Sequence, residues 1–286
     1  MTPYPLPQPL LFTYLFGIGA CVGSFLGLVI ARLPANQSII TPRSRCDACK
    51  TPLRWYDNVP LVSYLVLRGR CRACGTAYGA RTVVLELVTA WLFVALGAHF
   101  GATWALCAWL VFASGLIAIT FLDIDYYWVP DVITYPLMAL ALAAACVPVG
   151  PTLKGALLGL GPAALLWLTA VAFERIAGKE GLGFGDIKLL AALGLMMGLP
   201  AALTALFLGS LLGAVAGSII LALGGHRQKS LPPLEDGAEP HAQDEEAWVP
   251  DPKAVPFGPF LVLGALEALF FPDFFARLFA HLVIGG

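Results

Sequence analysis

Residues 181–200, "GLGFGDIKLLAALGLMMGLP", place an aspartate directly before a run of apolar residues. Glycines stand at positions 181, 183 and 185, and Asp186 follows them. The run that begins at Ile187 has the composition of a membrane helix. An unpaired carboxylate in such a helix costs a few kcal/mol or more, so it is expected to be either used or neutralised. The segment therefore predicts a membrane helix that begins at a carboxylate with a function.

The composition of the whole chain agrees with a membrane protein. Of its 286 residues, 59% are hydrophobic and 12% are charged, and the mean hydropathy is +0.81. Soluble domains carry about a quarter charged residues. The chain is therefore expected to be an all-α polytopic membrane protein. Its formal net charge of −1 gives no reason to expect a nucleic-acid partner.

The apolar segments predict about eight transmembrane helices. They cover approximately residues 10–31, 83–99, 104–122, 132–148, 152–173, 187–198, 201–223 and 255–271. Several are shorter than the roughly 20 residues of a straight crossing. Small residues recur in "GALLGLGPAALL" and "LGSLLGAVAGS", as in helices that pack closely within a membrane.

The basic residues predict the orientation. Nine of the 17 lysines and arginines lie in the loop from Arg32 to Arg81, so this loop is expected in the cytoplasm. Alternating the spans puts residues 123–131 and 175–186 at the same face. We expect a first transmembrane helix (1–32), a cytoplasmic cysteine domain (33–82) and a membrane domain (83–286) that carries the aspartates described next. The Pro-rich, acidic segment 226–253 reads as a flexible loop.

Two aspartates are expected at that shared face. Asp123 closes the third predicted span, in "TFLDIDYYWVPD", and Asp186 opens the sixth. Two carboxylates at one depth can share a proton and hold a water molecule between them. One then acts as the base on water while the other donates to the carbonyl oxygen of a peptide bond. The pattern predicts an aspartic peptidase whose catalytic residues are Asp123 and Asp186.

The neighbouring glycines and acids have simpler explanations as well. Gly183 and Gly185 let another backbone approach and permit a positive φ, although an ordinary flexible helix entry is the alternative. Asp131 follows Pro130 and is expected to cap the next helix, and Asp125 reads as a solvated loop acid. The roles of Glu86 and Glu267, whether satisfied by polar partners or lining a wet cavity, stay open.

Four cysteines predict a metal site. Cys46 and Cys49 form one Cys-x-x-Cys pair and Cys71 and Cys74 form another, with 21 residues between the pairs. This is close to the spacing of a four-cysteine zinc ribbon, and cytoplasmic thiols stay reduced. Four thiolates leave no open coordination position, so a structural zinc ion is expected.

In combination, these motifs resemble the type IV prepilin peptidases, the leader peptidases and N-methyltransferases of type IV pilus and type II secretion systems. The resemblance covers nearly the whole chain. It is carried by "GSFLGLVIARLP", the cysteine segment, "DIDYYWVPD", "GKEGLGFGDIKLLAALG" and "VPFGPFL". It maps the catalytic aspartates onto Asp123 and Asp186, and the cysteine tetrad onto Cys46, Cys49, Cys71 and Cys74.

The resemblance implies that the substrates are prepilins or pseudopilins, cut at the cytoplasmic membrane face to remove a basic leader. It also implies methylation of the new N-terminal residue from S-adenosylmethionine, for which the sequence itself has no cofactor fingerprint. Gly27 departs from the family pattern, as do Thr82 and Val83.

Two other functions fit parts of the pattern. Carboxylates and broken helices within a membrane also mark proton-coupled transporters, but both key aspartates lie at the ends of spans. A membrane-anchored zinc module that only binds a partner would leave Asp123 and Asp186 without a role.

Overall fold

A computed structural model gives the fold of the chain and describes residues 7–41, 43–46, 48–147, 150–178, 183–222 and 255–272. Within these residues the regular structure is helical, and pairing of extended backbone is limited to two isolated β-bridges. The all-α prediction is therefore confirmed. The predicted flexible loop, 226–253, lies outside the described residues.

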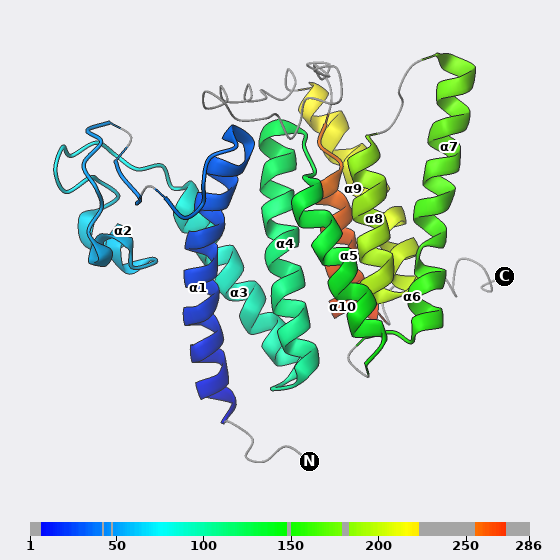
Figure 1. Cartoon of the computed structure of the whole chain (residues 1–286), viewed down its shortest axis with the longest axis horizontal. Coiled ribbons are helices and arrows are strands. Elements are labelled where there is room, and N and C mark those ends of the chain that lie inside the picture. Colours follow the sequence, from blue (N-terminus) through cyan, green and yellow to red (C-terminus); the bar gives the residue numbers. More distant parts are fainter. Residues whose placement is uncertain are drawn as a thin grey trace. The chain divides into compact units, whose positions relative to one another are not determined.

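Most helices lie within the apolar segments of the sequence, and Figure 1 draws and labels the α-helices. The α-helices are α1 (Gln8–Arg32), α2 (Val62–Leu67), α3 (Arg81–Phe100), α4 (Trp104–Tyr126), α5 (Asp131–Ala145), α6 (Leu153–Gly159), α7 (Gly161–Ala177), α8 (Phe184–Met197), α9 (Leu199–Ala222) and α10 (Gly258–Phe270). Two short 3₁₀ helices, η1 (Leu33–Ala35) and η2 (Trp55–Asn58), complete the described elements.

Five helical segments are long and apolar enough to cross a membrane. They are Gln8–Ala35, Arg81–Phe100, Trp104–Tyr126, Leu153–Ile176 and Leu199–Ile220. The three other predicted spans contain shorter helices, namely α5, α8 and α10, which have 15, 14 and 13 residues. The polytopic membrane fold is confirmed, whereas only five of the eight predicted spans reach crossing length among the described residues.

The chain divides into two compact units, and α4 begins in the first, up to residue 118, and ends in the second. In the first unit, α1 packs closely against α3. A Cβ atom on Gly19 would lie 2.7 Å from the Cα of Ala90, and one on Gly23 would lie 2.7 Å from the Cα of Glu86. The glycines of α1 thus let the two helix backbones touch, as small residues do in membranes.

In the second unit, α8 is the central helix. It contacts α5, α6, α7, α9 and α10, and Leu189, Leu190 and Leu193 are fully buried. Gly194 of α8 crosses Gly159 of α6 with their backbones in contact. Because protein surrounds α8, this helix need not match the thickness of the bilayer, which accounts for its short length.

Candidate active site and cysteine cluster

Asp123 is a buried residue in the last turn of α4, so it lies inside the helix instead of closing it. Its Oδ2 atom accepts a hydrogen bond of 2.9 Å from the backbone N–H of Gly258, the first residue of α10. A Cβ atom at position 258 would lie 2.7 Å from that oxygen. Gly258 therefore both binds the carboxylate and leaves room for it.

Asp186 lies in the first turn of α8 and is partly exposed. Leu189, one turn further along α8, contacts the same glycine, since a Cβ on Gly258 would lie 3.5 Å from its Cδ2 atom. The α8 face that carries Asp186 therefore contacts Gly258, and Gly258 also binds the carboxylate of Asp123 on α4. Asp123 and Asp186 therefore lie on helix turns that both reach Gly258.

The glycines before Asp186 provide space, and neither Gly183 nor Gly185 uses the positive φ that glycine permits. Gly183 is the N-cap of α8 with φ −65° and ψ 129°, and Gly185 is not among the residues with positive φ. A Cβ on Gly183 would lie 3.7 Å from Asp186 Oδ2, and one on Gly185 would lie 2.8 Å from the Cβ of Val129. Gly185 therefore allows the segment after α4 to touch the start of α8.

The two other acids of "DIDYYWVPD" differ from their predicted roles. Asp125 lies in the last turn of α4 and not in a loop. Asp131 is the first residue of α5, whose N-cap is Pro130, and no side chain caps this helix. Asp131 instead forms an ion pair with Lys188 of α8.

Lys188 is a residue that the sequence analysis missed. Its ammonium group also lies 4.9 Å from the ring centroid of Phe184 and 5.7 Å from that of Tyr135. It therefore connects the first turns of α5 and α8. The sequence signal for Lys188 was its position two residues after Asp186, because that spacing puts both residues at the same end of one helix.

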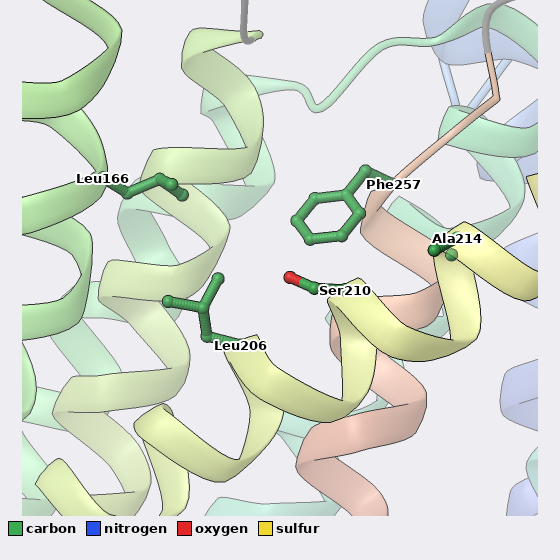
Figure 2. Close-up of a pocket in the computed structure, with 6 residues that line it drawn as sticks. Leu166, Leu206, Ser210, Ala214 and Phe257 are labelled. Atoms are coloured by element: carbon green, nitrogen blue, oxygen red, sulfur yellow. The ribbon is translucent and has the colours of Figure 1, made fainter.

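A separate apolar pocket lies between α7, α9 and Phe257. It encloses about 290 Å³, and its lining residues are Leu166, Leu206, Ser210, Gly213, Ala214 and Phe257. Figure 2 shows the Phe257 ring and the side chains of Leu166 and Leu206 around this space. The lining contains neither aspartate, and Gly258, next to Phe257, donates its N–H to Asp123. The pocket is therefore not where the carboxylates act.

The four predicted cysteines come together in the first unit. Their sulfur atoms all lie within 4.8 Å of one another, with Cys46 Sγ 3.8 Å from Cys74 Sγ and Cys49 Sγ 3.9 Å from Cys71 Sγ. Four thiolates placed tetrahedrally about 2.3 Å from a zinc ion would be separated by about 3.8 Å. The spacing of the sulfur atoms thus fits a tetrahedral metal ion.

Two turns of the same design supply these cysteines. The Cys46 N–H donates to Thr51 O and the Cys71 N–H donates to Thr76 O, at 3.0 and 2.8 Å. The Cys49 and Cys74 thiols each donate to the hydroxyl of the following threonine, Thr51 or Thr76. The repeated pattern Cys-x-Ala-Cys-x-Thr was the sequence signal for both threonines.

The Cys71 thiol of the cluster has a lowered pKa. The Tyr78 hydroxyl and the backbone amides of Cys74 and Ala73 lower the pKa of Cys71 to about 6. The thiolate is the form that binds a metal ion. The lowered pKa of Cys71 therefore favours the form of that ligand that binds a metal ion.

Comparison with known proteins identifies the family. Residues 18–100 match the bacterial peptidase A24 N-terminal domain, and residues 110–218 match the type IV leader peptidase family. A prepilin leader peptidase/N-methyltransferase of Myxococcus xanthus (strain DK1622) is 36% identical over 97% of this chain and 96% of the relative. The chain belongs to the type IV leader peptidase family.

Two further members of the type IV leader peptidase family carry the same name. The protein of Aeromonas salmonicida (strain A449) is 33% identical, and the match covers 96% of each chain. That of Pseudomonas aeruginosa PAO1 is 34% identical over 92% of this chain and 91% of the relative. No solved structure matches the chain significantly. The resemblance seen in the sequence motifs is thus confirmed over nearly the whole length.

Proposed function

We propose that this chain is an aspartic endopeptidase in which Asp123 and Asp186 form the catalytic pair. The proposal is supported by geometry: these two residues are 63 positions apart in the sequence, and the helix turns that carry them both reach Gly258. Membership of a peptidase family favours this function over the transporter alternative.

In the proposed reaction, one aspartate takes a proton from a water molecule between the carboxylates, and the water oxygen attacks the carbonyl carbon of the scissile bond. The other aspartate donates to the carbonyl oxygen. Collapse of the tetrahedral intermediate breaks the C–N bond. The departing nitrogen takes the proton that the first aspartate removed from water, and the second aspartate regains its proton as the carbonyl group re-forms. Gly183 and Gly185 support the site by keeping the start of α8 open around Asp186.

The proposed substrates are type IV prepilins or pseudopilins, because the relatives are named prepilin leader peptidases. The proposed location is the bacterial inner membrane, with the basic leader of the substrate removed at the cytoplasmic face. The five apolar helices support a multi-pass membrane protein. The nine basic residues around the cysteine segment support the cytoplasmic side, by the positive-inside rule.

We also infer that the chain methylates the new N-terminal residue, since the relatives are named N-methyltransferases as well. S-adenosylmethionine would supply the methyl group. The described residues contain no strand–glycine loop–helix unit of the kind that holds such cofactors. We therefore derive no step of the transfer from this structure.

For the cysteine cluster we propose a structural zinc ion held by Cys46, Cys49, Cys71 and Cys74. The supporting observations are the tetrahedral sulfur spacing and the absence of a fifth ligand group in the cluster found among the described residues. Four protein ligands close the coordination sphere, so the ion would stabilise this segment without touching a substrate.

The peptidase proposal is tested by co-expressing a prepilin with the Asp123→Asn and Asp186→Asn variants and measuring the substrate mass. Each variant is expected to leave the leader attached, because an amide cannot serve as the base or replace the shared proton. Asp125→Asn is the matched control, two residues away on α4, and is expected to cleave. Full cleavage by either of the first two variants would refute the assignment.

A further inference from the structure

The short helix α2 is attached to a membrane-spanning helix by a buried carboxylate. Glu86 of α3 is 4% exposed, and its Oε2 atom accepts a hydrogen bond of 2.8 Å from the backbone N–H of Leu61, the N-cap of α2. Leu61 has φ 60°, an unfavourable conformation for a leucine. Such a conformation persists only where its surroundings hold it. The bond to Glu86 therefore fixes where α2 begins.

This attachment sets the depth of α2. Glu86 lies five residues into α3 (Arg81–Phe100), which corresponds to about 7 Å along the helix axis. The 20 residues of α3 match the roughly 30 Å thickness of a hydrocarbon core. On α1, Gly23 packs against Glu86 nine residues before Arg32, the end of that helix. Both helices thus place the start of α2 beside the two membrane-spanning segments, within two to three turns of their ends, and not out in the aqueous phase.

The surface of α2 at this level is apolar. Val62, Leu65 and Val66 share one helix face by their spacing, and they are 55%, 75% and 69% exposed. Trp55 of η2, an element in contact with α2, is 82% exposed. Aliphatic side chains next to a tryptophan are typical of segments that lie in a membrane interface.

The chain that leaves α2 is basic. Arg68 and Arg70 follow the helix directly, and both are exposed. Their charges complement the anionic headgroups of a bilayer, which attract arginine and lysine near the surface. An apolar face flanked by cations, beside the ends of two membrane-spanning helices, matches a lipid surface better than it matches water.

We propose that α2 is an interfacial helix that inserts Val62, Leu65 and Val66 into the bilayer edge while Arg68 and Arg70 bind anionic headgroups. The cysteine segment would then be held on the membrane at two points, the anchor at Glu86 and the lipid contact of α2. This inference depends on the membrane location of the chain and not on its peptidase activity.

The test uses the full-length protein in nanodiscs that contain phosphatidylglycerol. A trifluoromethyl-phenylalanine is incorporated at Leu65, and its fluorine signal is recorded with either a doxyl-labelled lipid or a water-soluble gadolinium chelate. Trp91, 62% exposed in the middle of α3, is the control position in lipid. Lys50, exposed in the cysteine segment, is the control position in water.

The Leu65 signal is expected to be broadened several-fold more by the doxyl lipid than by the chelate, as at Trp91 and opposite to Lys50. The Arg68→Gln/Arg70→Gln variant, or phosphatidylcholine in place of phosphatidylglycerol, should reduce the lipid effect. Broadening like that at Lys50 would overturn the proposal. Protection from both reagents would also overturn it, because protein would then cover the α2 face.

Discussion

At position 258, a single hydrogen atom in place of a side chain decides whether Asp123 can keep its position. Replacing Gly258 with alanine would put a methyl carbon 2.7 Å from Asp123 Oδ2, closer than real Cβ contacts permit. The carboxylate would have to move, and a displacement of about 1 Å in a catalytic group costs about 10²-fold in rate. We expect Gly258→Ala to lower kcat by about that factor with little change in KM, in a prepilin cleavage assay.

The matched control for this variant is Gly217→Ala on α9. A Cβ there would lie 3.5 Å from Val255 Cγ2, an ordinary contact, so cleavage should stay near the wild-type rate. A Gly258→Ala enzyme with wild-type kcat would show that the Asp123 carboxylate is not held where the structure places it.

Residues within short motifs were predictable, whereas their distant partners were not. The glycine–aspartate turn and the two cysteine pairs are local patterns whose chemistry follows from residue type and spacing. Gly258 stands 135 positions from Asp123, and no periodicity connects the two. The "VPFGPFL" motif was part of the family resemblance, but only the packed helices showed that its glycine serves the carboxylate of Asp123.

Among the elements, α5 and α8 are joined at their first turns by Asp131 and Lys188. Because the Asp131 side chain is 49% exposed, the pair should stabilise the fold by about 1 kcal/mol at most. Its larger effect is expected on position, since Lys188 lies two residues after Asp186. We expect Lys188→Met to lower the cleavage rate about tenfold while unfolding changes little.

A double-mutant cycle measures the coupling between Asp131 and Lys188 separately from the effect of each single substitution. Asp131→Asn should also slow cleavage, and the double variant should be no slower than Lys188→Met alone, as measured by initial rates of prepilin cleavage. Losses that simply add would mean that the two residues act independently and that the ion pair does not position α8.

The helices themselves were largely predictable, because long apolar runs leave the backbone no better choice in a membrane. The sequence did not show that the fifth predicted span breaks into α6 and α7 near Gly161 and Pro162. It also did not show that α8 is enclosed by other helices. Both depend on packing between segments, which hydropathy alone does not encode.

On the scale of the whole molecule, the cysteine cluster and the aspartates belong to different compact units. Removing the metal ion should therefore affect one unit and spare the other. We expect a chelator, or the Cys71→Ser variant, to speed amide hydrogen exchange in residues 44–78, since ligand binding and folding are coupled in small metal domains. Exchange in α8 and α9 should be unchanged.

The control for metal removal is Cys107→Ser, an exposed cysteine of α4 outside the cluster, which should retain the zinc content of the wild type. Elemental analysis of the purified, reduced protein measures that content directly. A metal-free chain with native exchange rates in residues 44–78 would contradict the structural role of the ion.

The hydrogen-bond donor to Asp123 is the backbone N–H of Gly258, and this affects how the pH dependence of cleavage is interpreted. A peptide amide keeps its proton at every pH at which carboxyl groups titrate, and among single substitutions only proline would remove it. Changes in cleavage rate with acidity must therefore arise from titrating side chains or from the substrate, and not from this donor. The contribution of position 258 stays constant, so the pH–rate profile of this enzyme can be read without correction for that donor.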